Sequence, residues 1–380
     1  MKKYIIYSAL YYPNLGGVEN YTYHLSKELL KMGHRVTLVT SNVFNLPTNE
    51  VIDGLEIYRL PCFNLLDGRF PVLKYNKICK QITKKLLQEK FDLAIINTRF
   101  YIHSLYAAKI SRKSNTKSIV IEHGATHFSI SSPFWDRVGH IYEHIETNIL
   151  KFLCKNYYGV SIKSCEWIKH FGIVPKGILY DAVDFKYIEE CLKKTNNQVD
   201  YREKLDLKCD DHIIAFVGRL ITQKGIIQLV EAAKIIQDKY PNWKIVIAGD
   251  GPLMSTLIEK QSKNTLLLGK IEHKDVISLL NQSDIFCLPS DEEGFCLAAV
   301  EAIATKTYIV STNVGIISEI VNNDQFGTII PTNSTDEIIK GLEGAICNNN
   351  REKVIENAYK RLISMGLSWE ELAKKIEKIV

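Results

Sequence analysis

Two glutamates and two cations in the second half of the chain have the residue types and spacing for chemistry. Glu293 and Glu301 are eight residues apart within SDEEGFCLAAVEAIATK (290–306), and Arg219 and Lys224 are five apart within GRLITQKG (218–225). Arginine offers a planar fork of donors and lysine a point charge, a pair that suits a diphosphate. A carboxylate inside an apolar helix is costly without a partner. Hydroxyl groups of a sugar or ribose would be suitable partners for Glu301.

The segment around Glu293 predicts a strand, an acidic loop and then a helix that begins at about residue 295. The first amides of such a helix would accept an anion. The residues that contribute these amides are Gly294, Phe295, Cys296 and Leu297. The simpler interpretation makes Glu293 a helix-start charge and the two cations solvated surface residues.

The first half of the chain offers a glycine pair and a histidine. Gly16 and Gly17 in YPNLGGVE precede a predicted helix, so their amides could approach an anionic ligand. His123 follows a predicted strand in IEHGATHF and could contact a reacting sugar. The structural alternatives are a plain tight turn and a satisfied histidine at a strand end.

Short apolar runs alternate with amphipathic helical stretches along the whole chain, which predicts parallel sheets built from βαβ units. The predicted strands include 3–10, 34–40, 92–97 and 118–123 in the first half, and 212–218, 243–249, 284–289 and 307–311 in the second. Ligands of such sheets bind beyond the carboxyl ends of the strands. The candidate residues lie at those ends, Gly218 among them.

Length and composition indicate a globular enzyme of two domains. The 380 residues exceed one ordinary core. No apolar stretch approaches the roughly 18 residues that would span a bilayer. Nine scattered cysteines without a zinc spacing indicate free thiols and a cytoplasmic location. Residues 1–200 carry 27 Lys and Arg against 18 Asp and Glu, so an anionic partner is expected there.

Six motifs together resemble the retaining GT-B glycosyltransferases of family 4, the glycosyl transferases group 1. They occur in the family's order over nearly the full chain: YPNLGGVE, MGHRVTLVT, the His123 loop, VGRLITQKG, IAGDGPL and SDIFCLPSDEEGFCLAAVEA. The chain departs from the family pattern at Asp181-Ala182-Val183-Asp184, at Lys306 and Tyr308, and at Gly315-Ile316.

The resemblance implies a GT-B fold, with two Rossmann-like domains that face each other across a cleft. We expect an acceptor-binding domain over 1–190 and a nucleotide-sugar-binding domain over 205–365. A last helix over 366–380 is expected to pack back on the first domain.

The resemblance also assigns roles to the candidate residues. Glu293 would bind donor-sugar hydroxyls and Glu301 the ribose, while Arg219 and Lys224 would neutralise the diphosphate. His123 would contact the transferred sugar, and Gly16 and Gly17 would let the first domain close over the donor. The donor would be a UDP- or GDP-linked sugar, with no further cofactor and no metal.

The resemblance implies transfer of a hexose or N-acetylhexosamine to a glycan or lipid-linked acceptor, in polysaccharide, lipopolysaccharide or other glycoconjugate synthesis. A non-catalytic nucleotide-sugar-binding protein and a GT-B-fold epimerase are the alternatives. A Rossmann dehydrogenase is disfavoured because no G-x-G-x-x-G opens either half, and nucleic-acid binding because the basic residues lack interleaved aromatics.

The basic segment 71–90 predicts an amphipathic helix with lysines opposite Ile78, Ile82 and Leu86. Packing on the core with a solvated lysine face is the simpler interpretation. The functional one is peripheral association with an anionic membrane.

Overall fold

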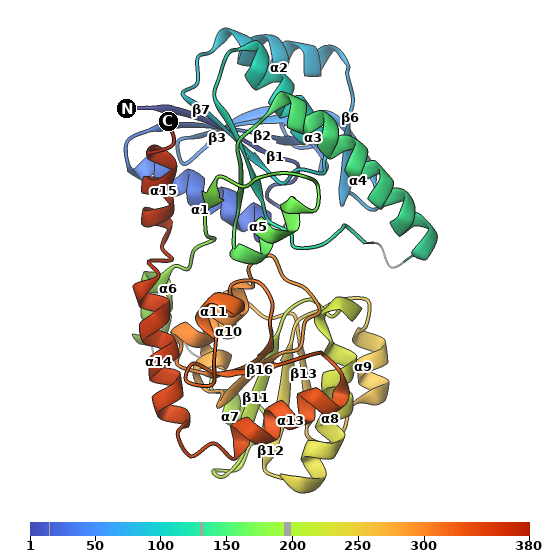
Figure 1. Ribbon diagram of the computed structural model, residues 1–380, viewed down its shortest axis with the longest axis vertical. Coiled ribbons are helices and arrows are strands. Elements are labelled where there is room, and N and C mark those ends of the chain that lie inside the picture. The colour runs from blue at the N-terminus through green and yellow to red at the C-terminus, as the bar shows by residue number, and fades with distance from the viewer. Residues whose placement is uncertain (15, 130–131, 194–198) are drawn as a thin grey trace. The chain divides into compact units, whose positions relative to one another are not determined.

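The computed structural model describes residues 1–14, 16–129, 132–193 and 199–380. The chain divides into two compact units (Figure 1). Unit 1 comprises Met1–Ala182 and Trp369–Val380, and unit 2 comprises Val183–Ser368. The predicted boundary at residue 190 differs from this division, because α6 (Phe185–Lys193) packs against α10 (His273–Asn281) of unit 2.

Unit 1 is built on an eight-stranded sheet in the order β10-β9-β8-β7-β1-β2-β4-β3. Only the β3–β4 pair is antiparallel. The central strands are almost wholly buried, as expected for a parallel sheet with helices on both faces. The strands are β1 (Lys3–Ser8), β2 (Arg35–Ser41), β3 (Asn49–Ile52), β4 (Leu55–Leu60), β7 (Leu93–Asn97), β8 (Ser118–Glu122), β9 (Tyr157–Gly159) and β10 (Gly177–Ile178).

The helices of unit 1 form two layers. Helices α2, α3 and α4 pack in sequence on one another, and α1 packs against α15. Their bounds are α1 (Gly17–Lys31), α2 (Lys77–Gln88), α3 (Ile102–Lys113), α4 (Pro133–Leu153), α5 (Ile162–Lys169) and α15 (Trp369–Glu377). A separate hairpin pairs β5 (Cys62–Leu65) with β6 (Phe70–Leu73). The start of the predicted 71–90 helix is therefore strand, and the helix begins at Lys77.

The closing helix α15 belongs to unit 1 although the chain reaches it through unit 2. The indole ring of Trp369 stacks on the imidazole of His24, with ring centroids 4.9 Å apart, and meets Tyr21 edge-on. Leu372, Ala373 and Ile376 are buried. Unit 1 thus includes both ends of the described chain.

Unit 2 is built on a wholly parallel six-stranded sheet in the order β13-β12-β11-β14-β15-β16. Figure 1 shows α8, α9 and α13 on one side of this sheet and α10, α11 and α14 on the other. The strands are β11 (His212–Val217), β12 (Trp243–Ala248), β13 (Thr265–Gly269), β14 (Ile285–Leu288), β15 (Tyr308–Thr312) and β16 (Thr328–Ile330). The predicted α/β class with parallel sheets is confirmed.

The remaining helices of unit 2 are α7 (Tyr201–Lys204), the 3-10 turn η2 (Thr222–Lys224), α8 (Ile226–Lys239), α9 (Met254–Lys260), α11 (Leu297–Ala304), α12 (Ile317–Ile320), α13 (Thr335–Ile346) and α14 (Arg351–Ser364). The predicted linker around residues 193–211 contains α7, and its residues 194–198 lie outside the described part of the chain. All nine cysteines are free, and five are buried in the two units, which confirms the expected free thiols.

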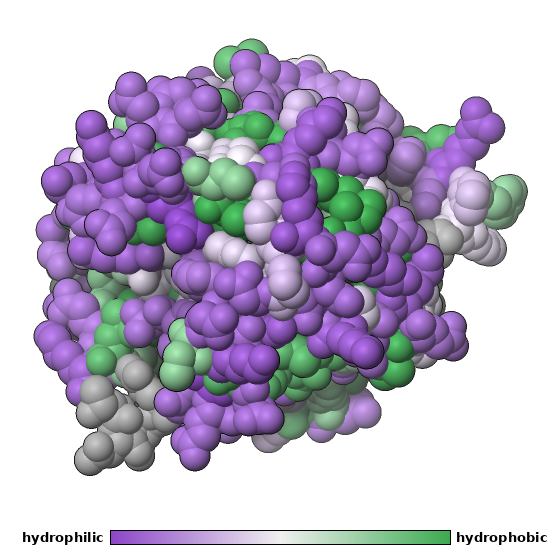
Figure 2. All heavy atoms as spheres, turned by 90° about the horizontal axis from the view of Figure 1, so that it is seen from below, coloured by the Kyte–Doolittle hydropathy of each residue, from purple (hydrophilic) through white to green (hydrophobic). Residues whose placement is uncertain are grey.

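The face of the molecule in Figure 2 is dominated by hydrophilic side chains, between which apolar ones appear in separate groups. Among the described residues, no helix is both long and apolar enough to cross a bilayer.

Candidate active site

In unit 2, the loops after β11, β12 and β14 meet at the carboxyl edge of the sheet. A Cβ atom on Gly225 would lie 2.0 Å from the carbonyl oxygen of Pro289, and one on Gly249 would lie 1.8 Å from that of Gly218. Both glycines have positive φ, +63° and +149°. Close backbone contact and backbone conformation therefore both require glycine at these two positions. These contacts pack the 3-10 turn η2, which ends at Lys224, directly against the loop that carries Glu293.

Lys224 and Glu293 form an ion pair at this edge. The ammonium group of Lys224 contacts Oε1 of Glu293, and the hydroxyl of Ser290 donates to the same oxygen at 2.8 Å. Burial is the largest single effect and would lower the pKa of Lys224, but the neighbouring groups, with the charge and hydrogen bond of Glu293 foremost, together raise the pKa. Lys224 therefore remains a cation at neutral pH. The positive charge of exposed Arg219 acts on the same ammonium group, which places the two predicted diphosphate ligands at one edge.

The loop after Glu293 leads into α11, which begins at Leu297, two residues later than predicted. Cys296 has a left-handed backbone with φ +80°, unusual for a residue with a side chain. Burial raises the pKa of its thiol, with Glu293 adding to the effect. The side chain of Phe295 is buried and its carbonyl accepts from the amide of Ile316 at 2.9 Å, so Phe295 helps to hold the loop.

Glu301 is buried on the second turn of α11, and its partner is a histidine. The ring Nε2 of His273 lies 2.6 Å from Oε1 of Glu301. Tyr187 stacks on the other side of the His273 ring, with centroids 5.1 Å apart. The expected partner was a ligand hydroxyl, but a protein side chain already satisfies one oxygen. Sequence analysis missed His273, although its place four residues after strand β13 was a usable signal.

In unit 1, His123 sits where β8 ends, beside the end of β7. Its Nε2 lies 3.2 Å from Oδ1 of Asn97, whose amide nitrogen donates to the hydroxyl of Thr22 at 2.8 Å. Because Asn97 turns its oxygen toward the ring, Nε2 of His123 must carry the proton and donate it. Tyr21 meets the ring edge-on with centroids 4.6 Å apart, and burial lowers the pKa of His123 to about 3. The imidazole is therefore neutral at physiological pH, with Nδ1 left to accept a hydrogen bond.

The two glycines before α1 differ in their surroundings. A Cβ atom on Gly16 would lie 2.3 Å from Oε2 of Glu19, whereas one on Gly17 would meet nothing within 4 Å. Asn14 donates to Oε1 of Glu19 at 2.8 Å, and burial raises the pKa of Glu19. A carboxyl group of the chain itself therefore lies at this helix start. A side chain at position 16 would have to displace the carboxyl group of Glu19, whereas position 17 has room for one.

A buried ionic cluster in unit 1 was not predicted from the sequence. The guanidinium of fully buried Arg99 pairs with Glu122 at 2.8 Å and with Glu143 at 2.6 Å, and donates to Thr147 at 2.9 Å. Glu146 is also buried, and burial raises its pKa to about 9. The signal lay in α4, where Glu143, Glu146 and Thr147 share one face of the helix.

Known proteins resemble both halves of the chain. The family model described as Glycosyltransferase Family 4 matches residues 15–184, and the model described as Glycosyl transferases group 1 matches residues 197–361. A human protein named as a phosphatidylinositol N-acetylglucosaminyltransferase subunit is 27% identical, over 98% of this chain and 74% of its own length. An uncharacterized glycosyltransferase of Methanocaldococcus jannaschii is 25% identical, over 99% of this chain and 97% of its own.

Solved structures share the fold over the whole chain. The sucrose-phosphate synthase of Thermosynechococcus elongatus has a TM-score of 0.75 at 16% identity and covers 100% of this chain and 98% of its own. Anabaena HepE in complex with UDP-glucose has a TM-score of 0.74 at 15% identity, covering 100% and 99%. With both family models in chain order and this fold, the chain belongs to the GT-B glycosyltransferases of family 4.

Proposed function

We propose that the chain is a retaining, metal-independent glycosyltransferase that moves a hexose or N-acetylhexosamine from a nucleoside-diphosphate sugar to a lipid-linked or glycan acceptor. The pairing of Lys224 with Glu293 at the carboxyl edge of the unit 2 sheet carries this proposal. It combines a cation for phosphate with an acid for sugar hydroxyls in one contact. Arg219 adds a second cation beside it.

The proposed step breaks the bond between the anomeric carbon and the diphosphate. The diphosphate leaves with the electron pair, and Arg219 and Lys224 stabilise the charge that grows on it. The acceptor oxygen bonds to the anomeric carbon on the face that the diphosphate leaves, and its proton passes to the departing phosphate. Glu293 would hold hydroxyls of the sugar, and Oε2 of Glu301 would accept from the ribose. His123, with Nδ1 available, would accept from a hydroxyl of the transferred sugar.

The named relatives favour an N-acetylhexosamine and a lipid. The human, Arabidopsis thaliana and Saccharomyces cerevisiae relatives are all named as phosphatidylinositol N-acetylglucosaminyltransferase subunits. UDP-linked N-acetylglucosamine is therefore the first donor to test, with UDP-glucose and the GDP sugars after it.

We also propose that unit 1 associates peripherally with membranes through the outer face of α4. Three of the four buried residues of this helix are polar, and most of its apolar residues are exposed, the reverse of an ordinary surface helix. The exposed apolar side chains are Phe134, Trp135, Val138, Ile141, Ile145, Ile149 and Phe152. From Trp135 onward they are spaced three or four residues apart and lie along one stripe, which suits insertion between lipid headgroups.

Two further features of unit 1 support a lipid surface at α4. The guanidinium of Arg112 lies 4.8 Å from the ring centroid of Phe152, which puts a cation beside the stripe to meet anionic headgroups. A cavity of about 450 Å³ opens next to Trp135 and is lined largely by Leu65, Leu66, Phe70, Phe100 and Phe128. Such a cavity could receive an acyl or prenyl chain.

Helix α2, for which the sequence suggested peripheral membrane association, offers less exposed apolar surface than α4. Cys79, Ile82 and Leu86 are buried in the core of unit 1, so its apolar face is mostly occupied. The simpler interpretation of segment 71–90, a packed helix with a solvated lysine face, describes α2.

A two-stage experiment tests the proposed activity. Thermal shifts with UDP, GDP, ADP and their sugars identify the donor, because a ligand bound only by the native state raises the melting temperature. Transfer from that donor to a lipid extract is then followed, and the anomeric configuration of the product is read by NMR. An inverted product would overturn the retaining mechanism. Donor binding without any transfer would favour the binding protein, and donor turnover without acceptor would favour the epimerase.

A further inference from the structure

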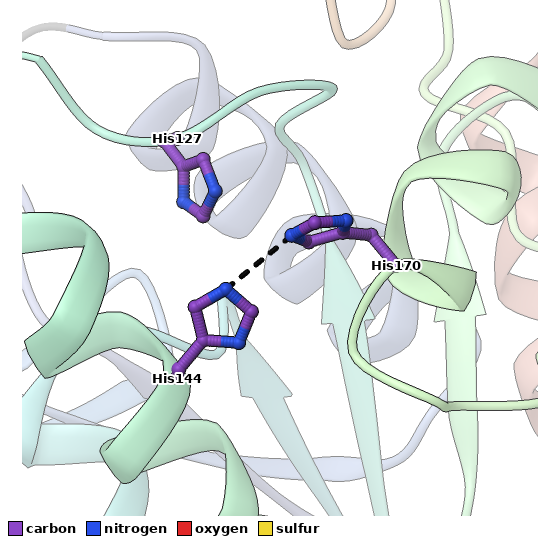
Figure 3. Close-up of side chains that lie close together, drawn as sticks. All are labelled: His127, His144 and His170. Carbon is purple, nitrogen blue, oxygen red and sulfur yellow. Dashed lines mark hydrogen bonds between the residues drawn. The ribbon is translucent and has the colours of Figure 1, made fainter.

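Three histidines of unit 1 converge from three separate elements. His127 lies in the loop after β8, His144 lies on α4, and His170 directly follows α5. One ring nitrogen from each lies within 4.8 Å of the others, and Nε2 of His144 is 3.3 Å from Nε2 of His170. Figure 3 shows the three rings grouped around a common point.

The spacing of the nitrogens is close to that of a tetrahedral metal site. Zinc binds histidine nitrogen at about 2.0–2.1 Å, so two ligands of a tetrahedron lie about 3.4 Å apart. The pair formed by His144 and His170 already has this separation. Two such bonds span at most about 4.2 Å. A nitrogen 4.8 Å from its neighbour therefore needs to move by about 1.4 Å to reach the tetrahedral separation, a distance that rotation of an imidazole ring about its side-chain bonds covers.

A carboxylate orients one of the three rings. Nδ1 of His127 contacts Oε2 of Glu143, which leaves Nε2 of His127 for a metal. Glu143 is in turn fixed by Arg99 at 2.6 Å. Metal-bound histidines characteristically give their second nitrogen to a carboxylate in this way. The indole of Trp167 stacks on the ring of His170 at 6° and restricts that ring as well.

The charge behind the histidines also favours a cation. Glu122, Glu143 and Glu146 are buried there, and Arg99 is the guanidinium that faces them. Burial raises the pKa of Glu146 to about 9, so this group is neutral, and the carboxylates of Glu122 and Glu143 remain against one guanidinium. A divalent ion on the histidines would supply positive charge close to Glu143.

We propose that His127, His144 and His170 bind one divalent transition-metal ion, with Zn²⁺ the best match to three imidazole ligands and water in the fourth position. The ion would tie the loop after β8 to α4 and α5. That loop begins at His123, so the metal would steady the backbone that carries this residue. His127, His144 and His170 are not among the residues assigned to the donor, so metal binding can be tested without an assay of transfer.

Metal titration of the purified, chelator-stripped full chain tests the proposal. We expect calorimetry to give one Zn²⁺ per chain. Co²⁺ should give the intense visible absorption of four-coordinate cobalt without a thiolate charge-transfer band. His170→Gln is the cleanest variant because His170 is exposed, and it should weaken Zn²⁺ binding by at least about 100-fold. Glu143→Gln should weaken it by about 10–100-fold, the cost of an orienting partner.

His24→Gln is the matched control, since His24 lies in unit 1 but outside the cluster, and it should bind Zn²⁺ as the unaltered chain does. His144→Gln serves as a second ligand variant, with circular dichroism of each metal-free protein as the folding check. Unchanged Zn²⁺ affinity in both ligand variants would overturn the proposal. A thiolate band would overturn it too, because the metal would then lie on cysteines such as exposed Cys209 and Cys347.

Discussion

His273 donates from Nε2 to Oε1 of Glu301 over 2.6 Å, so the buried acid of α11 is held by the first residue of α10. The histidine side chain is 53% exposed and the glutamate side chain 6%. The hydrogen bond to Glu301 raises the pKa of His273, against the opposing effect of burial. The pair connects two helices that follow different strands, and it sets the direction in which Glu301 points.

The first prediction concerns the pH dependence of stability. A histidine whose folded pKa is raised adds stability below its unfolded pKa of about 6.5, and this stability is lost as pH rises through the higher folded pKa. His273→Gln can still donate to Glu301 but carries no charge. It should therefore lower the free energy of unfolding by more at about pH 5.5 than at about pH 8.5. Urea unfolding of both proteins across this range measures it. An equal cost at both ends would show that the charge on His273 contributes nothing.

The second prediction concerns the cation at the proposed diphosphate site. Lys224→Ala should lower kcat by about 10²–10³-fold, because the leaving group loses a preorganised positive partner. Turnover of the donor found by thermal shift measures this. Lys234→Ala on α8 is the matched control, since Lys234 is exposed. If both variants kept the unaltered kcat, Lys224 would have no part in the transfer.

The third prediction concerns the contact between two loops of unit 2. Gly225→Ala should lower the free energy of unfolding by at least about 1–3 kcal/mol, since it adds a Cβ to a left-handed residue and forces that atom onto the carbonyl of Pro289. Gly344→Ala on α13 is the control. A Cβ there meets nothing within 4 Å, and alanine in a helix should stabilise by about 0.5–1 kcal/mol. Opposite signs in denaturant titrations are expected, and a neutral Gly225→Ala would contradict the close approach of the two loops.

The fourth prediction concerns the apolar stripe of α4. The double variant Ile141→Ser and Ile145→Ser should lose most of its co-sedimentation with vesicles that contain anionic lipid. Both side chains are exposed, so their replacement removes no core packing. A variant of two other exposed isoleucines, Ile235→Ser and Ile258→Ser in unit 2, should bind as the unaltered chain does. Equal sedimentation of the two variants would exclude the stripe as the membrane contact.

Sequence periodicity predicted the central strands of both sheets and α1, because apolar spacing reports directly on buried faces. It placed Lys224 and Glu293 together for a related reason, since the ends of parallel strands share one edge. The same rule did not predict how α4 packs. Spacing shows which side of a helix is apolar, but in α4 the polar side faces the core, because Arg99 lies there to pair with Glu143.

Other elements of the fold and site left weak local signals. Strands β3 to β6 are only four to six residues long, and β3 and β5 are largely exposed, so their patterns are faint. The partner of Glu301 is the first residue of α10, 28 residues earlier in the chain. Contacts of this kind depend on how helices cross, which the spacing of residues along the chain does not encode.

The position of α15 has a consequence for synthesis on the ribosome. Every residue of unit 2 has been made before Trp369 is added, so unit 2 can fold while the chain is still growing. Unit 1 starts first but is completed later, because the surface of α1 that receives Trp369 stays uncovered until residues 369–380 emerge. The nascent first half therefore leaves the contact surface of Tyr21 and His24 uncovered until the end of translation, and chaperones would be expected to bind there.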